Sequence, residues 1–142
     1  MTIAGPPALP DRLHAWAIRL LRWLREADRA SPLSAAELSA LSVVVHRGPL
    51  SLTQLADLEQ VRPPTMSRLV SSMEERRIIE RARTAEDRRV VRISATEAGR
   101  SMLEEGRQRR LESLGGALSE LGSRDRHVLE EAVDVLERLL PR

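Results

Sequence analysis

Two helix-start signals in the middle of the chain enclose a helix-stop signal. Ser34-Ala-Ala-Glu37 and Ser51-Leu-Thr-Gln54 are both capping boxes. In such a box the serine hydroxyl accepts from an amide of the first turn, and the glutamate or glutamine side chain accepts from the serine amide. Gly48-Pro49 lies between the two boxes and is a typical helix end. The sequence therefore predicts one helix that ends at a tight turn and a short second helix that begins directly after it.

A third helix is expected to begin at Arg62-Pro-Pro-Thr65, after the short helix ends near Glu59-Gln60. Proline is tolerated there because the amides of a first turn have no helical partner. Two short helices in this arrangement form a helix-turn-helix pattern. The expected buried face of the third helix consists of Met66, Leu69, Val70 and Met73.

The period of the pattern then changes from helix to strand. Ile78-Ile-Glu-Arg81 and Val90-Val-Arg-Ile93 are β-branched runs on either side of the polar stretch from Arg83 to Arg88, which predicts a β-hairpin with a charged tip. Ser94-Ala-Thr-Glu97 is a third capping box that should start a long helix, and Gly115-Gly116 should weaken or bend that helix. The predicted fold is mainly α, of the α+β kind: a winged helix-turn-helix with a two-stranded hairpin as its wing.

Two outer helices carry apolar stripes, over residues 10–29 and 124–141. A small central domain cannot cover both stripes, so we expect a homodimer; the alternative is an intramolecular helical bundle. The expected organisation is an N-terminal arm at 1–10, dimerisation helices at 11–32 and 115–142, and a winged helix-turn-helix DNA-binding domain with its linking long helix at 33–114.

Composition narrows the class of protein. The fractions of hydrophobic (42%) and charged (31%) residues are those of a globular domain, and the absence of cysteine excludes disulfides, thiolate metal sites and thiol redox switches. No apolar run approaches the roughly 20 residues that span a bilayer, and the N-terminus does not have the pattern of a signal peptide. We therefore expect a cytoplasmic protein.

The basic residues, all of them arginine, are concentrated in the middle of the chain. From Arg62 to Arg92 there are nine arginines and five acids, a local charge of +4, against +2 for the whole chain. This distribution favours a polyanionic partner for the middle segment. The alternative is a solvated charged surface with no partner.

The helix that begins at Arg62 is the second helix of the predicted helix-turn-helix. In such a motif, the first part of this helix contacts base edges in the major groove. Arg68 is the leading candidate there, because its planar fork can bind guanine or phosphate through two hydrogen bonds. In the hairpin tip, Asp87 could hold an arginine by a charge-assisted pair and direct it into a narrow minor groove. The predicted DNA-binding residues are Ser51, Arg62, Pro63, Pro64, Thr65, Ser67, Arg68, Asp87, Arg88 and Arg89.

These segments resemble the MarR family of bacterial regulators. The resemblance rests on Val61–Val70, the Asp87-Arg-Arg89 tip and Ile93–Arg100, and it implies a dimer with two winged domains on successive major grooves. It also implies that Asp87 and Arg89 match the family's wing Asp-x-Arg pair, with Arg89 or the neighbouring Arg88 reaching the minor groove. Most members repress transcription, and they release DNA when a small aromatic or phenolic ligand binds between the dimerisation and DNA-binding regions.

The chain departs from the family pattern at two turns. Arg77 follows the third helix where many members have glycine, so we expect that turn to adopt another geometry. Glu59-Gln60 replaces the glycine often found before the same helix. Neither departure alters the predicted fold.

The ligand-binding candidates are Trp16, Trp23 and His46, which lie near the junction where the resemblance places an effector pocket. A tryptophan there could stack on an aromatic ligand, although a tryptophan in such a place is more often simply part of the core. The histidines are far apart in the sequence and have no acid or cysteine neighbour at metal-ligand spacing. No metal and no cofactor is predicted.

Two other functional classes are less well supported by the sequence. An enzyme is disfavoured because the chain has no glycine-rich phosphate loop, nucleophile elbow or paired His-Glu metal motif. A nonspecific architectural DNA-binding module, or a winged helix used for protein interaction, is the alternative to a sequence-specific regulator. Preference for a palindrome with half-sites about one helical turn apart would distinguish a regulator from such a module.

Overall fold

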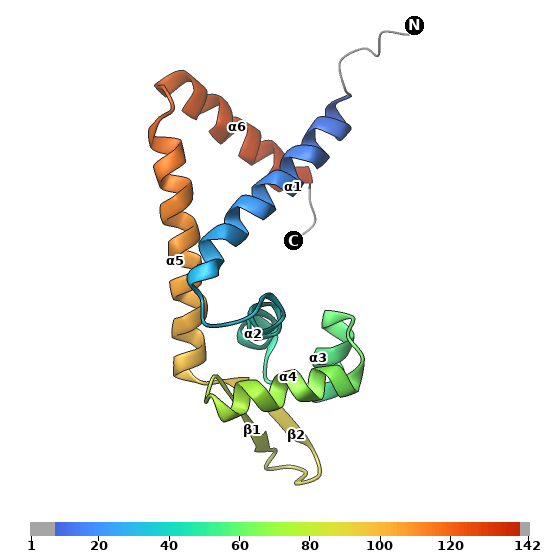
Figure 1. Cartoon of the computed structure of the whole chain (residues 1–142). Coiled ribbons are helices and arrows are strands. Elements are labelled where there is room, and N and C mark those ends of the chain that lie inside the picture. Colours follow the sequence, from blue (N-terminus) through green and yellow to red (C-terminus); the bar gives the residue numbers. More distant parts are fainter. Residues whose placement is uncertain (1–7, 140–142) are drawn as a thin grey trace, which may run out of the picture. The chain divides into compact units, whose positions relative to one another are not determined.

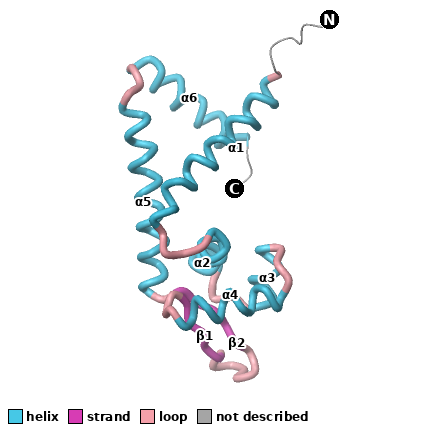
Figure 2. Tube along the Cα trace, in the orientation of Figure 1, coloured by secondary structure: helices cyan, strands magenta, loops and turns pink. Residues whose placement is uncertain are grey.

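The computed structural model describes residues 8–139 of the chain (Figures 1 and 2). The predicted fold class is confirmed, because the chain is mainly helical and contains a two-stranded antiparallel hairpin. The elements in order are α1 (Leu9–Ala27), the 3-10 turn η1 (Asp28–Ala30), α2 (Ala35–Arg47), α3 (Leu52–Glu59), α4 (Pro63–Glu75), β1 (Ile79–Arg83), β2 (Val91–Ala95), α5 (Glu97–Ser119) and α6 (Ser123–Leu139).

The chain divides into two compact units. One unit, residues 28–108, contains α2, α3, α4, the hairpin and the first half of α5, and we call it the winged unit. The other contains α1, the end of α5 and α6. Of the arm predicted for residues 1–10, positions 1–7 lie outside the described residues, and α1 already begins at Leu9. The predicted end of the last helix at 140–142 also lies outside them.

The core of the winged unit lies between α2, α3, α4 and the hairpin. The predicted buried face of α4 is confirmed: Met66, Val70 and Met73 are fully buried, and Leu69 packs against them half-buried. The other large side chains that are fully buried are Leu41, Leu55, Ile78, Ile79 and Ile93. A helix-turn-helix and a wing are therefore joined in one apolar core.

Both capping boxes of the helix-turn-helix region are present. The Glu37 carboxylate accepts from the Ser34 amide (2.8 Å), and the Gln54 side chain accepts from the Ser51 amide (2.9 Å). The two serine hydroxyls accept in return. Gly48 ends α2 with extended backbone, and a Cβ atom there would overlap the Val44 carbonyl oxygen. The close approach of the chain, rather than a left-handed turn, is what requires glycine at this position.

The third predicted capping box is wrong. Ser94 lies within β2, paired with Glu80, so the helix cannot begin until the ladder ends. Thr96 is the residue that caps α5: its hydroxyl accepts from the Gly99 amide (3.1 Å). The same hydroxyl lies 2.6 Å from the Arg77 carbonyl oxygen, which ties the start of α5 to the end of α4. Because Ser94 is paired in the strand, it does not act as the helix cap that the local sequence predicts.

The expectation of another geometry at Arg77 is also wrong. Arg77 adopts the left-handed conformation that glycine favours, with φ of 56°. Its amide donates to Glu74 (2.9 Å) and the Ile78 amide donates to Met73 (2.9 Å), which is the Schellman pattern of a helix end. Gln60 ends α3 in the same way, with φ of 54°. The chain keeps the backbone of these turns without the glycine.

The other unit leaves its apolar side chains uncovered within one chain. α5 runs through Gly115-Gly116 without a break, so this pair does not end the helix. Neither α1 nor α6 has a buried residue. Between residues 8 and 139, no helix has the length and apolar character needed to cross a membrane. Exposed apolar side chains of the two helices include Leu9, Trp16, Ile18, Leu21, Trp23, Val128, Val133, Val135 and Leu139.

Candidate nucleic-acid interface

The start of α4 is an exposed surface of short side chains around one arginine. Arg62 precedes the helix without a side-chain cap, and Pro63 and Pro64 occupy its first turn. Proline suits this position because it lacks the amide that would have no partner. The exposed predicted residues are Arg62, Pro63, Pro64, Thr65 and Arg68, while Ser67 is half-buried.

One side of α4 forms a row that faces away from the core. Thr65 and Arg68 are exposed and lie three residues apart, so they are neighbours on the helix surface. The helix ends at Glu75, which is also exposed. Arg68 is the single basic residue of α4 and lies in the middle of the helix. The row offers a guanidinium and a hydroxyl, which are donors that base edges and phosphates can accept.

The predicted site residue Ser51 is the N-cap of α3. Its hydroxyl accepts from the Gln54 amide at 3.2 Å, and its own amide donates to the Gln54 side chain. The hydroxyl keeps a proton that it can donate to a phosphate oxygen.

The register of the hairpin determines on which face of the wing each strand arginine lies. Arg81 pairs with Ile93 and Arg83 with Val91, so these residues share the face that also carries core residues. Arg92 pairs with Ala82 on the opposite face. The wing therefore presents arginines on both faces as well as at its tip.

The tip of the wing is a turn closed by its own side chains. The Thr84 hydroxyl donates to the Asp87 carbonyl oxygen (2.8 Å) and accepts from the Asp87 amide (3.2 Å). The Asp87 carboxylate accepts from the backbone amide of Arg89 (2.9 Å). The expectation that Asp87 holds an arginine side chain is thus corrected, since its partner is the main chain. What Asp87 orders is the turn that carries Arg88 and Arg89.

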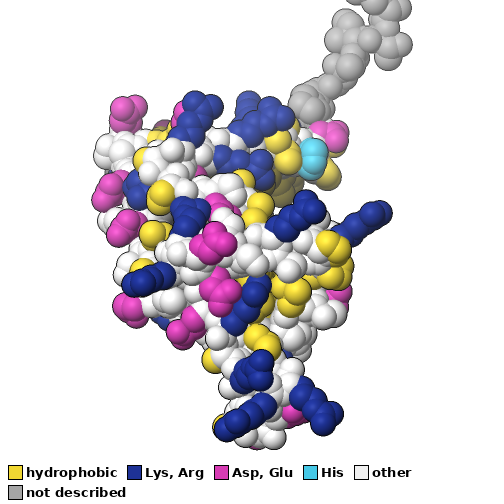
Figure 3. All heavy atoms as spheres, turned by 60° about the horizontal axis from the view of Figure 1, so that its bottom comes forward, with side chains coloured by type: hydrophobic (Ala, Val, Ile, Leu, Met, Phe, Trp, Pro, Cys, Tyr) yellow, Lys and Arg dark blue, Asp and Glu magenta, His cyan; other side chains and the backbone are white. Residues whose placement is uncertain are grey.

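Arg88 and Arg89 are exposed, and neither forms an ion pair with a carboxylate of residues 8–139. Figure 3 shows basic side chains gathered at the end of the molecule where the hairpin tip lies. Their guanidinium groups are therefore available to an anionic partner.

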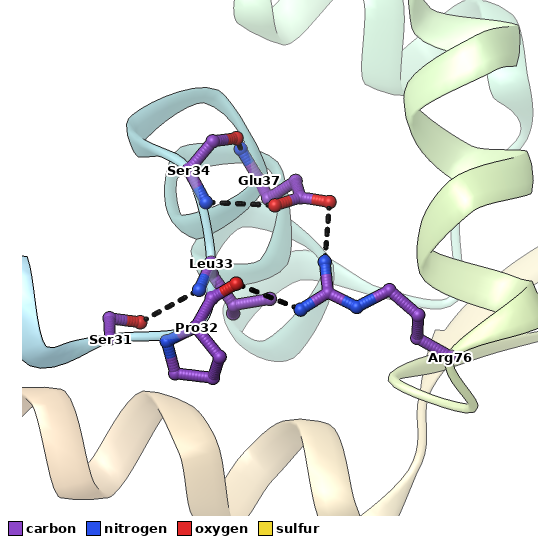
Figure 4. Close-up of polar contacts among 6 residues, drawn as sticks. All are labelled: Ser31, Pro32, Leu33, Ser34, Glu37 and Arg76. Atoms are coloured by element: carbon purple, nitrogen blue, oxygen red, sulfur yellow. Dashed lines mark hydrogen bonds and ion pairs between the residues drawn. The ribbon is translucent and has the colours of Figure 1, made fainter.

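The far end of α4 is held by a buried acid (Figure 4). The Arg76 guanidinium donates to the Glu37 carboxylate and to the Pro32 carbonyl oxygen, each at 2.9 Å. Burial raises the pKa of Glu37, but hydrogen bonds from Ser34 and the charge and hydrogen bond of Arg76 outweigh burial, so the pKa lies below its ordinary value. The capping box of α2 is therefore also an anchor for the C-terminal end of α4. No local pattern in the sequence indicates this role, because Arg76 and Glu37 are 39 positions apart in the chain.

The three predicted ligand-binding residues are divided between the two units. Trp16 and Trp23 are exposed on α1, and Trp16 lines an open cavity of about 640 Å³ together with Leu9 and Leu13. His46 lies on α2 of the winged unit, with Nδ1 2.7 Å from the Ser42 carbonyl oxygen. Among the described residues, no three histidine, aspartate or glutamate side chains are grouped as metal ligands.

Comparison with known proteins gives a consistent result. Residues 33–91 match the family model described as the MarR family. An HTH-type transcriptional regulator of Mycobacterium bovis is 34% identical over 132 residues, which is 93% of this chain and 92% of that protein.

Solved structures agree. A MarR family protein from Bacillus stearothermophilus superposes with a TM-score of 0.73 at 26% identity, covering 92% of this chain and 91% of its own. A Staphylococcus aureus MepR mutant bound to an oligodeoxyribonucleotide has a TM-score of 0.74 at 17% identity, covering 95% and 100% of the two chains. At that identity the second likeness concerns the fold alone.

Proposed function

The chain belongs to the MarR family of DNA-binding, winged helix-turn-helix transcription regulators, and from that premise we propose that it is a homodimeric repressor of a palindromic operator. It acts by binding rather than by catalysis, in the cytoplasm where the DNA is. The observation that carries the proposal is the exposed row on α4, with Arg68 as its cation, in the same unit as the exposed arginines Arg88 and Arg89.

In this proposal α4 lies in the major groove and the wing lies along the adjacent minor groove. Arg68 reads a base edge or anchors a phosphate, with Thr65 and Ser67 beside it. Arg88 and Arg89 meet the negative potential of the minor groove, which is strongest where the groove is narrow. The Ser51 hydroxyl and Arg62 donate to phosphates at the edge of the major groove.

The homodimer is supported by the surfaces of α1 and α6. Both helices keep large apolar side chains exposed in the single chain, and such patches mark interaction sites. Their charges are also complementary: α1 has four arginines and two acids, whereas α6 has three arginines and five acids. Two copies can therefore bring these helices together without repulsion.

Release by a small aromatic or phenolic ligand is the regulatory part of the proposal. Trp16 supports it, because an exposed indole beside an open apolar cavity can stack on an aromatic ring. Salicylate, a phenol that is also an aromatic carboxylate, is a suitable probe. It should release operator DNA from the wild type and act more weakly on Trp16→Leu, whereas Trp16→Phe, which keeps an aromatic ring, should respond nearly as the wild type does. Equal release from all three proteins would exclude Trp16 from the ligand site.

Binding to DNA selected from random sequence tests the central proposal. We expect the selected site to be a palindrome with half-sites about one helical turn apart. Affinity for it should exceed affinity for random duplex by about 10³-fold or more at the same salt concentration. A protein that binds all duplexes equally would be an architectural module, and one that binds none would contradict the proposal as a whole.

A further inference from the structure

We propose that the five arginines of the wing divide into two groups with different roles. Arg81 and Arg92 are positioning residues that hold the hairpin against α3 and α4, whereas Arg83, Arg88 and Arg89 contact DNA. The inference deepens the proposed function and rests on it, because it presumes that the wing meets DNA.

Arg92 connects β2 to the start of α3. Its Nη1 atom lies 2.7 Å from Oε1 of Gln54, across 38 positions of the chain. The same oxygen accepts from the Ser51 amide at 2.9 Å and so also closes the capping box. Gln54, in the first turn of α3, therefore accepts the hydrogen bond that connects the wing to this helix.

Arg81 connects β1 to α4. Its Nη2 atom lies 3.3 Å from the Ser71 hydroxyl oxygen, and its Nη1 atom lies 3.4 Å from a carboxylate oxygen of Glu74. Both partners are half-buried on α4. Because Arg81 and Arg92 lie on opposite faces of the hairpin, the two bridges restrain the wing from both sides.

The hairpin meets the helices through a backbone bridge and beside an open pocket. β2 joins the helix-turn-helix backbone through the bridge between Leu50 and Ile93, with N–O distances of 3.1 and 2.7 Å. A pocket of about 270 Å³ that is open to solvent lies beside this bridge, with Leu52, Arg81 and Val91 among its walls. The polar bridges therefore add to the apolar contacts that Ile79 and Ile93 make in the core.

Arg83, Arg88 and Arg89 differ from this pair. All three are exposed, and within the described chain none of them forms an ion pair or a side-chain hydrogen bond with another side chain. Arg83 lies on the same face as Arg81 but nearer the tip. Its guanidinium is therefore open to a phosphate, whereas that of Arg81 is engaged with α4.

The two roles differ in how they respond to salt. Each phosphate neutralised by an arginine contributes about −0.9 to the slope of log K against log salt concentration, because counterions are released. Removing an arginine that neutralises a phosphate therefore makes the slope shallower. Removing a positioning residue weakens binding while the number of neutralised phosphates, and hence the slope, stays the same.

The experiment compares the wild type with Arg92→Ala and with the matched control Arg83→Ala. Operator affinity is measured at several salt concentrations from about 50 to about 300 mM, a range in which the affinity depends steeply on salt. We expect Arg92→Ala to bind several-fold more weakly with an unchanged slope. Arg83→Ala should make the slope shallower by about 0.9 for each phosphate that is no longer neutralised. An Arg92→Ala slope that falls as that of Arg83→Ala does would make Arg92 a DNA-binding residue and overturn the proposal.

Gln54 provides the second test. Gln54→Glu keeps an acceptor for both the Ser51 amide and Arg92, so it should keep the bridge and bind more tightly than Gln54→Ala. Gln54→Ala should weaken binding at least as much as Arg92→Ala, because it removes the bridge and also the acceptor of the Ser51 amide. The double variant should be no weaker than Gln54→Ala, since the bridge is already absent from that variant. Additive effects would contradict the bridge. Thermal melts of each variant show whether it is folded, and a wild type without operator affinity would instead reject the proposed function.

Discussion

At the scale of single residues, Arg68 differs from the other basic residues of the winged unit. It is the one cation of α4, it is exposed, and it lies one turn beyond Thr65 on the row that faces away from the core. A planar guanidinium in this place can bind guanine through two hydrogen bonds, which no short side chain of the row can do.

Replacing Arg68 tests whether it reads a base. Arg68→Ala should cost about 1–3 kcal/mol of binding free energy on the selected operator if Arg68 contacts a base edge. Arg68→Lys keeps the charge without the planar fork and should recover little of that affinity. Titrations on operator and on random duplex at one salt concentration measure both effects. Equal effects on the two duplexes would make Arg68 a phosphate anchor instead.

Asp87 acts in the tip of the wing as a hydrogen-bond acceptor. Its carboxylate accepts from the Arg89 amide. An asparagine side chain has a carbonyl oxygen of the same size and can accept the same hydrogen bond. We therefore expect the tip of the wing to need an acceptor at this position rather than a charge.

Asp87→Asn should therefore keep operator affinity close to that of the wild type, or raise it, because one negative charge is removed from the DNA-facing turn. Asp87→Ala should weaken binding, since the tip no longer has the acceptor that orders it. Arg89→Ala is the reference for a tip without its arginine, and gel-shift titration compares the three. If Asp87→Asn bound as weakly as Arg89→Ala, the charge itself would be the essential feature.

At the scale of elements, α4 is held by its apolar face and, at its C-terminal end, by side-chain hydrogen bonds. Arg76 joins that end to α2 and to the segment before it, and the carbonyl of Arg77 receives the Thr96 hydroxyl at the start of α5. The N-terminal end, which the proposal places on DNA, has no side-chain cap. Side-chain hydrogen bonds thus hold the C-terminal end of α4, while its first turn is open to the DNA of the proposal.

The ion pair of Glu37 predicts a pH dependence of stability. Because the pKa of Glu37 is lower in the folded chain than its ordinary value of 4.5, its contribution is present above that value and disappears as the pH falls through the folded pKa. Glu37→Gln should lower the free energy of unfolding at neutral pH, and its difference from the wild type should shrink below about pH 4. Denaturant unfolding at several pH values measures this difference. A difference independent of pH would mean that the charge of Glu37 contributes nothing.

The left-handed conformation of Arg77 predicts that glycine at this position would stabilise the fold. A residue with a side chain at φ of 56° is strained relative to glycine. Arg77→Gly should therefore stabilise the fold by about 0.5–1 kcal/mol, after allowing for the greater freedom of glycine in the unfolded chain. Arg77→Ala, which stays strained, is the control. A melting temperature lowered equally by both changes would show that the arginine side chain itself stabilises the turn.

At the scale of the whole molecule, the two units divide the work. The winged unit contains an apolar core and the candidate DNA surface. The unit with α1 and α6 has apolar side chains but buries none of them on these two helices. In the proposed homodimer, a second copy of the chain would give this unit a core.

The dimer can be tested without disturbing the winged unit. Val128 is 55% exposed on α6, so Val128→Glu should not unfold a single chain but should place an unpaired charge in a dimer interface. We expect a monomer by sedimentation, normal helix content, and operator affinity reduced by at least the contribution of one half-site. Glu130→Gln, on the same helix, is the control. A Val128→Glu protein that remains dimeric would place the interface elsewhere.

Much of the fold could be predicted because its signals are local. The capping boxes at Ser34 and Ser51, the Gly48-Pro49 stop and the prolines that begin α4 act within one helical turn, through hydrogen bonds and fixed backbone angles. Burial of Met66, Val70 and Met73 followed from helical periodicity alone. Residues that act through their immediate neighbours can be identified without the rest of the chain.

Only the tertiary structure decided which distant groups meet. Pairing of Ser94 with Glu80 moved the start of α5 to Thr96, and burial of Ile78 in the core accompanies the left-handed conformation of Arg77. The partners of Arg76 and Arg92 lie 39 and 38 positions away. Arginines that look alike in the sequence have different partners, because a guanidinium finds its acceptor through the packing of helices and strands, and no local pattern records that packing.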